Sequence, residues 1–384
     1  MPNDFETMAF EDLQTPALLL DPERMERNIA RMRDRMKSLE VGFRPHVKSA
    51  KSFEVIRRML DAEHGPVTVS TLQEAEELAA AGFRDILYAV GLTPNKVARV
   101  EALRRRGVDL KVIVDNAEAA AVLSQVAGTG DTPIPALIEV DSDGHRAGVC
   151  PGDVEALRHI AEQLRGGIRP AGVITHAGGS YASTSTAEIR HYARKERDAV
   201  LAAADILRDA GHQVDHVSLG STPTALFAEE LAGVTEVRAG VFVFFDLVMA
   251  GVGACAVDDI ALSVLASVNT IQRDRNRILV DAGWMAMSRD RGTAAQRVDQ
   301  HYGIVCDIDG RPWPDLVMLE ANQEHGVIGV RPGSTAVIPD LQIGSMVRIL
   351  PNHACATAAQ HGAYHLAPAG GRRIEGRWER WRGW

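Results

Sequence analysis

Several short stretches of the chain combine residue types that can do chemistry together. The first, Arg44-Pro45-His46-Val47-Lys48, indicates an apolar strand that ends in a lysine, with a helical pattern soon after it. Pro45 keeps the residue before it extended. A lysine at the carboxyl end of a strand is well placed to act in an active site, but most lysines are simply solvated. This stretch alone leaves both interpretations open.

Two turns rich in small residues have the composition of an anion site. Gly220-Ser221-Thr222-Pro223-Thr224 opens a helical pattern, and Arg238-Ala239-Gly240 follows the next strand pattern. Glycine lets a ligand approach the backbone, and the N–H groups at the start of a helix favour negative charge. The alternative for the first turn is a Ser-Thr cap with proline at the first helical position. The place of both turns in the fold, argued below, favours a phosphate site.

Two further strand ends carry an unusual set of side chains. One is Asp141-Ser142-Asp143-Gly144-His145-Arg146, and the other is Thr175-His176-Ala177-Gly178-Gly179-Ser180-Tyr181. A structural loop does not need this many Gly, His, Arg and Tyr residues, although any one of them can be a loop hydrogen-bonder. Together with a phosphate turn and a strand-end lysine, they indicate pyridoxal phosphate held as a Schiff base. Burial and nearby cations would draw the lysine amine toward neutrality.

A metal pair is indicated near the end of the chain by Asn352-His353-Ala354-Cys355. On an extended stretch, His353 and Cys355 would point to the same face. Imidazole and thiolate together suit Zn²⁺. The alternative is a satisfied core histidine beside a buried cysteine. Glu324-His325-Gly326 is a further polar group with the types of an acid, a base or a supporting partner.

The elements that must position these residues alternate between strand and helix. Eight apolar strands with intervening helices are typical of a parallel (β/α)8 barrel, whose active site lies at the carboxyl ends of the strands and whose phosphate sites favour the loops after strands 7 and 8. A doubly wound sheet gives the same alternation, but eight units in about 200 residues favour closure. The predicted strands are 43–48, 67–71, 85–90, 110–115, 136–141, 171–176, 216–220 and 236–240, and the predicted helices are 22–39, 51–62, 72–81, 94–106, 117–126, 152–164, 186–210 and 223–231.

From about Ala256 the pattern changes to short β-rich segments separated by Gly, Pro and Asp. These segments are 261–270, 277–281, 303–307, 327–330, 336–338 and 346–350, and the end of the chain from Arg372 to Trp384 is predicted to be a packed tail. We therefore predict two domains. Residues 22–250 form a barrel that binds pyridoxal phosphate, and residues 251–384, joined by a strand from the N-terminal segment 1–21, form a mainly β domain that carries the metal site.

Composition and net charge limit the classes of partner that the protein is expected to bind. A net charge of −9 over 384 residues argues against a nucleic-acid partner, which would require a basic face. No apolar run has the length of a membrane span, and the acidic start of the chain has no signal-peptide pattern. The four cysteines have no paired spacing, which is typical of reduced thiols in a cytoplasmic protein.

These motifs together resemble the fold-type III, alanine racemase-like pyridoxal phosphate enzymes. The resemblance is to the group that contains D-threonine aldolases, eukaryotic-type D-serine dehydratases and D-3-hydroxyaspartate dehydratases, and the tracts 234–249 and 281–290 are similar to dehydratases acting on D-threo-3-hydroxyaspartate. The motifs that carry it are Arg44-Pro45-His46-Val47-Lys48, Asp143-Gly144-His145-Arg146, Thr175-His176-Ala177-Gly178, Gly220-Ser221-Thr222-Pro223-Thr224, Val280-Asp281-Ala282-Gly283-Trp284, Gln323-Glu324-His325-Gly326 and Pro351-Asn352-His353-Ala354-Cys355.

The resemblance implies a homodimer that binds pyridoxal phosphate and one divalent metal. Lys48 would carry the cofactor and act as the catalytic base, and His353 and Cys355 would hold the metal, with zinc favoured over manganese, cobalt or magnesium. The other residues implied in cofactor binding are Arg146, His176 and Tyr181 at the ring and Gly220, Ser221, Thr222 and Gly240 at the phosphate.

Two features separate dehydratase from aldolase within the family that the chain resembles. The metal pair of the aldolases is His-x-Asp, whereas here it is His353-Ala354-Cys355. In the aldolases a histidine six residues beyond the counterpart of His176 acts as base for the β-hydroxyl, whereas this chain has Ala182 there. β-Elimination needs only removal of the α-proton, by Lys48, and a metal-assisted hydroxyl leaving group. The expected reaction is therefore loss of water from a D-3-hydroxy amino acid, with D-threo-3-hydroxyaspartate giving oxaloacetate and ammonia and D-serine giving pyruvate.

Three alternatives remain at this point. Retro-aldol cleavage by a D-threonine aldolase-type enzyme is the first. An amino-acid racemase would need a catalytic tyrosine, for which Tyr302 and Tyr364 are available, and a non-catalytic pyridoxal phosphate-binding protein would lack a β domain. Arg289 or Arg291 has the charge to meet a second substrate carboxylate, or is a solvated loop cation.

Overall fold

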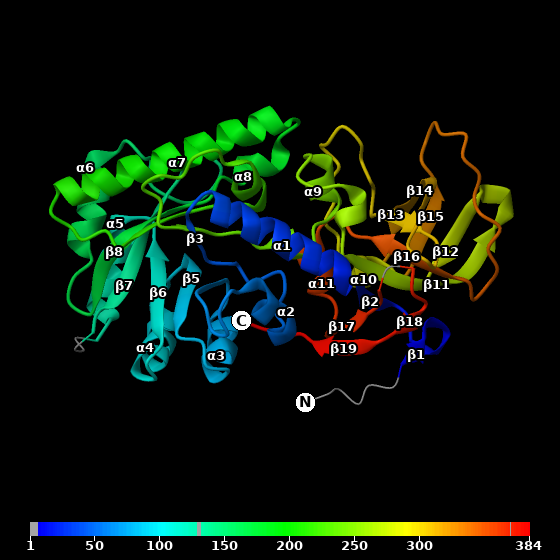
Figure 1. Ribbon diagram of the computed structural model, residues 1–384, viewed down its shortest axis with the longest axis horizontal. Helices are drawn as coiled ribbons and strands as arrows, with labels where there is room; N and C mark the ends of the chain where they lie inside the picture. Colours follow the sequence, from blue (N-terminus) through cyan, green and yellow to red (C-terminus); the bar gives the residue numbers. More distant parts are fainter. Residues whose placement is uncertain (1–6, 129–131, 369) are drawn as a thin grey trace. The chain divides into compact units, whose positions relative to one another are not determined.

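The computed structural model describes residues 7–128, 132–368 and 370–384. The chain folds into two compact units (Figure 1). The barrel unit consists of Arg31–Gly240 and the last two residues, Gly383–Trp384. The β unit combines the chain up to Ala30 with Val241–Arg382, so helix α1 (Pro22–Ser38) runs from one unit into the other.

The barrel unit is built on a parallel sheet in the order β3-β10-β9-β8-β7-β6-β5-β4. His46, just after β3, forms a parallel bridge with Thr68 of β4, and the Val47 N–H donates to the Thr68 carbonyl at 2.9 Å. The segment that leads to Lys48 therefore closes the ring, and the predicted (β/α)8 barrel is confirmed. The strands are β3 (Gly42–Phe43), β4 (Val67–Val69), β5 (Asp85–Gly91), β6 (Asp109–Val114), β7 (Ile134–Val140), β8 (Ile168–Thr175), β9 (His216–Leu219) and β10 (Glu236–Val237).

The helices of the barrel unit begin at polar caps that the sequence provides. The side chains of Thr71, Asn116, Asp153 and Ser185 each accept the backbone N–H three residues on, which satisfies a donor that the helix itself cannot. The predicted helices are confirmed to within a few residues, although the last is shorter than 223–231. They are α2 (Phe53–Met59), α3 (Leu72–Ala80), α4 (Val97–Arg105), α5 (Ala117–Val126), α6 (Val154–Gln163), α7 (Thr186–Asp209) and α8 (Thr222–Phe227).

A buried ion network lies near the amino ends of the barrel strands. Arg44 is 2% exposed, and its guanidinium contacts Glu236 Oε2 and Asp85 Oδ1, each at 2.7 Å. Lys111 Nζ lies 2.8 Å from the same Asp85 oxygen. An apolar layer of Leu87, Ile113, Leu137, Ala171 and Ile174 packs the sheet. Because Arg44, Lys111 and Glu236 are removed from water, each depends on its charged partner, whereas the Asp85 side chain is 43% exposed.

We expect Arg44→Ala to reduce the free energy of unfolding by about 3 kcal/mol, because it removes the cation that contacts the buried Glu236 carboxylate and leaves Asp85 with Lys111. Urea unfolding of the full-length chain measures this change. The matched control is Arg208→Ala, which breaks an exposed pair with Asp205 at 2.9 Å and should cost about 0.5 kcal/mol or less. Equal effects of the two substitutions would contradict the role given to the network.

The β unit contains a second barrel. The antiparallel pairings β11–β12–β15–β14–β13–β16–β11 form a closed ring, and β2 adds to β11 as an extra antiparallel strand. A strand of the N-terminal segment therefore belongs to this sheet. The strands are β1 (Met8–Ala9), β2 (Ala17–Leu20), β11 (Leu262–Gln272), β12 (Arg277–Val280), β13 (Ile304–Cys306), β14 (Pro312–Ala321), β15 (Gly326–Val330), β16 (Met346–Leu350), β17 (Ala363–Leu366), β18 (Arg373–Ile374) and β19 (Gly376–Glu379), with helices α9 (Leu247–Gly251), α10 (Trp284–Met287) and α11 (Ala354–Ala358).

The strand predicted at residues 336–338 is wrong. This segment is irregular, and Val337 is 84% exposed. Pro332 and Pro339 flank it, and proline cannot donate a hydrogen bond to a neighbouring strand. The sequence patterns also missed β14 and the strands of the C-terminal tail.

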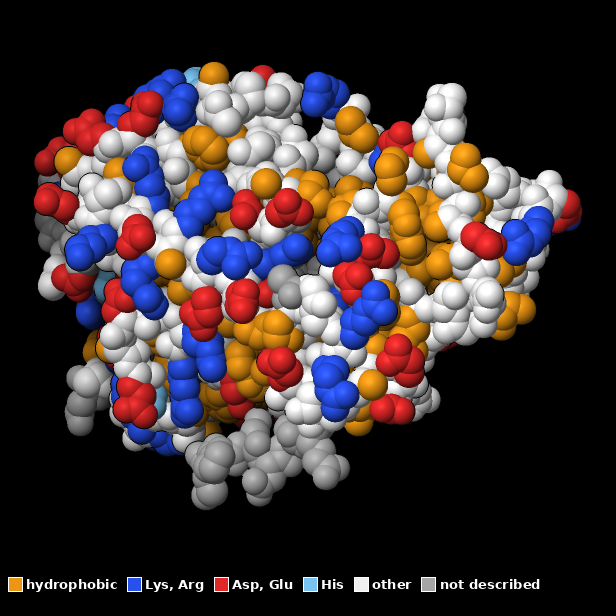
Figure 2. Space-filling model, turned by 45° about the vertical axis from the view of Figure 1, so that its right-hand side comes forward, with side chains coloured by type: hydrophobic (Ala, Val, Ile, Leu, Met, Phe, Trp, Pro, Cys, Tyr) orange, Lys and Arg blue, Asp and Glu red, His pale blue; other side chains and the backbone are white. Residues whose placement is uncertain are grey.

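The molecular surface carries both signs of charge. On the face drawn in Figure 2, Lys and Arg side chains lie among Asp and Glu side chains and do not form a separate basic patch. Among the residues that the structure describes, no helix is both long and apolar enough to cross a membrane.

Candidate active site

Lys48 lies in the turn between β3 and α2, at the carboxyl end of its strand as predicted. The residue is exposed, whereas Val47 and Ser49 on either side of it are completely buried. The backbone N–H groups of Ala50 and Lys51 both donate to the Val47 carbonyl, at 3.0 and 2.9 Å. The turn is therefore anchored in the core while the amine stays accessible.

His176 follows β8 and is held as a neutral imidazole. Its Nδ1 lies 2.9 Å from the Gly220 carbonyl, so Nδ1–H donates and Nε2 is left as the acceptor. Burial lowers the pKa of His176 to about 3, the hydrogen bond to Gly220 opposes this, and the charges of Arg146 and Lys48 add to the decrease. The Tyr181 ring lies 5.9 Å from the His176 ring, centroid to centroid. Among the predicted cofactor residues, Lys48 and Arg146 therefore lower the pKa of His176, and the Tyr181 ring lies near its imidazole.

His46 is a second neutral histidine beside Lys48. Burial lowers its pKa well below the usual value, and the charges of Lys48 and Arg238 lower it further. Arg238 is 5% exposed, and its Nε donates to Ser218 Oγ at 2.9 Å. Lys48, Arg146 and Arg238 are the cations near these two imidazoles, which add no positive charge of their own, and the carboxylates of Glu196, Glu236 and Glu139 lie within electrostatic reach of Arg238.

The two glycines predicted at the phosphate site have no room for a side chain. Gly220 has a φ of +134°, and a Cβ built on it would lie 2.3 Å from the Arg238 carbonyl oxygen. A Cβ on Gly240 would lie 2.8 Å from the His46 carbonyl oxygen. Two strand-end turns therefore approach each other closely through their backbones at the point where the sequence predicts phosphate binding.

Ser221 serves as a helix cap, so the structural alternative for this turn is realised. It forms a capping box with Thr224: the Ser221 N–H donates to Thr224 Oγ1 at 3.0 Å, and the Thr224 N–H donates to Ser221 Oγ at 3.2 Å. Ser221 Oγ also lies 2.9 Å from Ser180 Oγ. Binding of a phosphate by Ser221 and the neighbouring Thr222 stays a prediction.

Taken together, the barrel residues fit pyridoxal phosphate. The cofactor has an aldehyde, an aromatic ring and a phosphate. The site offers an accessible lysine, neutral imidazoles, three cations within electrostatic reach of His176, and glycine turns that have no room for side chains.

The predicted metal pair lies in the β unit at the start of α11. His353 is the N-cap residue and Cys355 lies in the first helical turn, so the expectation of an extended stretch is wrong. The two side chains are nevertheless hydrogen-bonded to each other. His353 Nδ1 lies 2.6 Å from Asp290 Oδ2. Burial lowers the pKa of His353, but Cys355 and Asp290 raise it to about 11.

A buried carboxylate fixes the turn that carries this pair. Asp246, 1% exposed, accepts the Ala354 N–H on Oδ2 at 2.9 Å and the Met249 N–H on Oδ1 at 2.9 Å. Burial raises the pKa of Asp246 to about 6. Imidazole and thiolate beside an orienting carboxylate form a donor set that fits Zn²⁺. Within the described residues, no group of three or more His, Cys, Asp or Glu side chains has metal-binding geometry.

The comparisons with known proteins match both units. A model of the alanine racemase N-terminal domain matches residues 20–248, and a model of a serine dehydratase domain matches residues 261–367. D-threo-3-hydroxyaspartate dehydratase of Delftia sp. HT23 is 49% identical over 97% of this chain and 98% of its own. The chain belongs to the fold-type III pyridoxal phosphate enzymes, in their D-serine dehydratase-like family.

Other members of this family are also similar over most of their length. D-serine dehydratase of Dictyostelium discoideum is 31% identical over 92% of this chain and 93% of its own, and D-threonine aldolase of Arthrobacter sp. is 29% identical over 91% and 88%. The solved structure of the Delftia enzyme has a TM-score of 0.93 at 48% identity, over 98% of this chain and 100% of that chain. A cysteine-to-alanine variant of it, in a metal-free form, gives the same values. The resemblance found in the sequence is confirmed.

The two candidates for the catalytic tyrosine that a racemase would need have other contacts here. Tyr364 is completely buried, accepts a hydrogen bond from Arg380 Nε at 2.8 Å, and burial raises its pKa to about 12. Tyr302 lies under the Arg291 guanidinium at 5.0 Å. Arg291 itself pairs with Asp299 at 2.6 Å, which favours a structural role for this arginine. Arg289 is exposed and lies 5.2 Å from the Trp284 ring.

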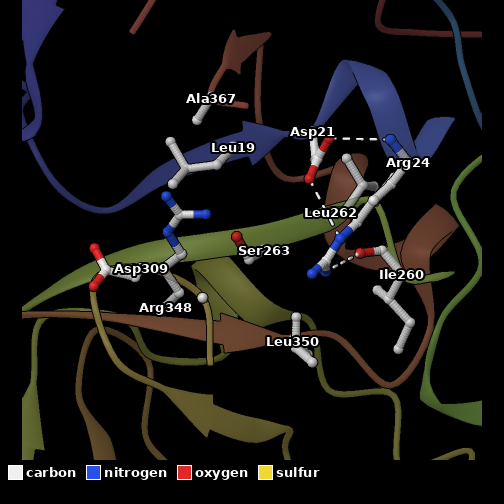
Figure 3. Close-up of a pocket in the computed structure, with 12 residues that line it drawn as sticks. Leu19, Asp21, Arg24, Ile260, Leu262, Ser263, Asp309, Arg348, Leu350 and Ala367 are labelled. Atoms are coloured by element: carbon white, nitrogen blue, oxygen red, sulfur yellow. Dashed lines mark hydrogen bonds and ion pairs between the residues drawn. The ribbon is translucent and has the colours of Figure 1, made fainter. Parts of the chain in front are cut away.

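A small cavity inside the β unit is too small for the substrates named for this family. It measures about 20 Å³ and is lined by Asp21, Arg24, Ser263 and Arg348 among others (Figure 3). Arg24 Nε pairs with Asp21 at 3.3 Å, and its Nη1 donates to the Ile260 carbonyl at 3.1 Å. A space of this size with polar walls has room for about one water molecule.

His361 gives the β unit a predictable pH dependence. Its Nε2 lies 2.9 Å from the Ala286 carbonyl, and burial lowers its pKa from 6.5 to about 4. The unfolded chain therefore binds this proton more readily, and the stabilisation present above pH 6.5 is lost as pH falls toward 4. Between pH 7 and pH 5, His361 should lower the free energy of unfolding of the wild-type chain by about 1 to 2 kcal/mol, and this part of the decrease should be absent in His361→Gln. Urea unfolding at both pH values measures it; the exposed His159→Gln serves as control and should keep the wild-type slope.

Two residues that contact the predicted site residues lacked a predicted role, Glu196 and Asp290. Glu196 has a sequence signal, because it falls on the buried face of α7 with Ala193 and Val200. Asp290 has none, because its contact with His353 spans 63 positions of the chain.

Proposed function

We propose that this enzyme removes water from D-threo-3-hydroxyaspartate to give oxaloacetate and ammonia. The observation that supports this most is the 49% identity to a D-threo-3-hydroxyaspartate dehydratase along nearly the whole of both chains. The β-hydroxyl and the α-proton leave the substrate, and the enamine that is released hydrolyses to the keto acid. D-Serine, with pyruvate as product, is a second substrate of the same reaction.

Lys48 takes the central role in this proposal. Its side chain would hold pyridoxal phosphate, and its amine is the group that would accept the proton from Cα. When bound, the cofactor supplies an electron sink for the charge that develops at Cα. Arg146, His176 and Tyr181 would contact its ring. Because His176 stays neutral, with Nδ1–H committed to Gly220, it does not compete with Lys48 for that proton.

The residues Gly220, Ser221, Thr222 and Gly240 are proposed to bind the phosphate through the two closely packed turns. His353 and Cys355 are proposed to hold one divalent metal, with Asp290 orienting the imidazole. When bound, the metal supplies Lewis-acid assistance to the departing hydroxyl. The thiolate favours zinc over manganese, cobalt or magnesium. The metal-free form of the Delftia cysteine variant supports this assignment.

Retro-aldol cleavage is the second candidate, because a D-threonine aldolase is among the relatives. That reaction needs a base for the β-hydroxyl, and Ala182 at the position expected for it offers only a methyl group.

We also propose that the enzyme is a cytoplasmic homodimer, as the resemblance implies.

Ammonia release with three substrates tests the proposal. The enzyme loaded with pyridoxal phosphate and metal is incubated with D-threo-3-hydroxyaspartate, D-serine and D-threonine, with the L-enantiomers as controls. We expect the highest kcat/KM with D-threo-3-hydroxyaspartate and no ammonia release from the L-enantiomers. A higher value with D-serine would replace the proposed substrate, and no ammonia from any of them would contradict dehydration.

A further inference from the structure

A buried carboxylate joins the two loops that the cofactor is proposed to contact. Glu196 lies in the middle of α7 and is completely buried. Its Oε1 accepts the Ala177 N–H at 2.8 Å and the Gly220 N–H at 3.1 Å. Ala177 follows His176 in the loop after β8, and Gly220 opens the turn after β9, so one oxygen ties both strand ends together.

The other oxygen of Glu196 reaches the helix cap. The Thr224 hydroxyl donates to Oε2 at 2.7 Å, and Thr224 Oγ1 in turn accepts the Ser221 N–H at 3.0 Å. Ser180 and Ser221 complete the connection, with their hydroxyl oxygens 2.9 Å apart. All these side chains are at most 2% exposed. Hydrogen bonds isolated from water in this way hold a geometry firmly.

We propose that Glu196 is a positioning residue for pyridoxal phosphate, which sets the distance between the His176 loop and the phosphate turn. It does not contact the cofactor. This inference rests on the proposed cofactor site. It explains why an acid interrupts the apolar face of α7, where Ala193 and Val200 are buried on either side of it.

The test is the dissociation constant of pyridoxal phosphate, titrated by absorbance into the full-length chain after removal of the cofactor. Glu196→Ala leaves two buried N–H groups unpaired, and we expect it to raise the dissociation constant about tenfold or more. Glu196→Gln keeps an oxygen for both N–H groups and should stay within about threefold of wild type. The control, Glu188→Gln, changes an exposed carboxylate on the same helix and should have no effect.

Cofactor affinity in Glu196→Ala within about twofold of wild type would overturn the inference. If that variant does not fold, Thr224→Val and Thr224→Ser decide instead: affinity lost in the first and kept in the second supports the inference, and affinity kept in both overturns it. A wild-type chain that binds no pyridoxal phosphate would contradict the proposed function, which separates the two failures.

Discussion

Lys48→Ala is expected to lower kcat by at least about 10³-fold, because the proposed mechanism assigns this one amine both cofactor attachment and removal of the α-proton. The fixed turn from Val47 to Ala50 places the substitution on a backbone that does not depend on the lysine side chain. Ammonia release from D-threo-3-hydroxyaspartate measures the rate. The absorbance of the bound cofactor, which changes when it is no longer linked to a lysine, gives an independent readout.

The matched control for this substitution is Lys37→Ala, an exposed lysine near the end of α1. It should change kcat by no more than about twofold, as expected for a surface substitution. Substantial dehydratase activity in Lys48→Ala, with the cofactor retained in its wild-type spectral form, would remove Lys48 from its assigned role.

Loss of the metal pair is expected to have the second largest effect. His353→Ala and Cys355→Ala should each lose bound metal on dialysis and lower kcat by at least about 10²-fold, because Lewis-acid assistance to the hydroxyl is worth several kcal/mol. Metal content per chain, measured by elemental analysis, is read beside the rate.

Two exposed residues of the same types serve as controls for the metal pair. His159→Ala on α6 and Cys150→Ala after β7 should leave both metal content and rate unchanged. If either variant of the pair kept its full metal content and full activity, the metal site would have to lie elsewhere.

Much of the fold could be predicted from the sequence, because the barrel strands and helices are encoded locally. The buried apolar runs of β5 to β9 and the side-chain caps of α3, α5, α6 and α7 each act within a few residues. β14 was missed because Pro312 and Pro314 interrupt its pattern. Pro312 is the first residue of β14, a position that tolerates proline, but a local pattern does not reveal which strands pair.

The site was predictable only as far as its chemistry follows motifs along the chain. Lys48 and the glycine turns stand at strand ends, where barrel geometry gathers them. Asp290 joins His353 across distant segments, and Glu196 gains its role from three contacts that no spacing encodes. The turn at Ser221 shows that a structural cap and a predicted phosphate turn can share the same residues, so the motif alone does not separate them.

The measurement that tests the central proposal most directly is product identification from D-threo-3-hydroxyaspartate with enzyme loaded with cofactor and metal. We expect oxaloacetate and ammonia in equal amounts, with no glycine. Glycine and glyoxylate in their place would show retro-aldol cleavage, contradict the dehydratase assignment, and require a hydroxyl base other than a side chain at position 182.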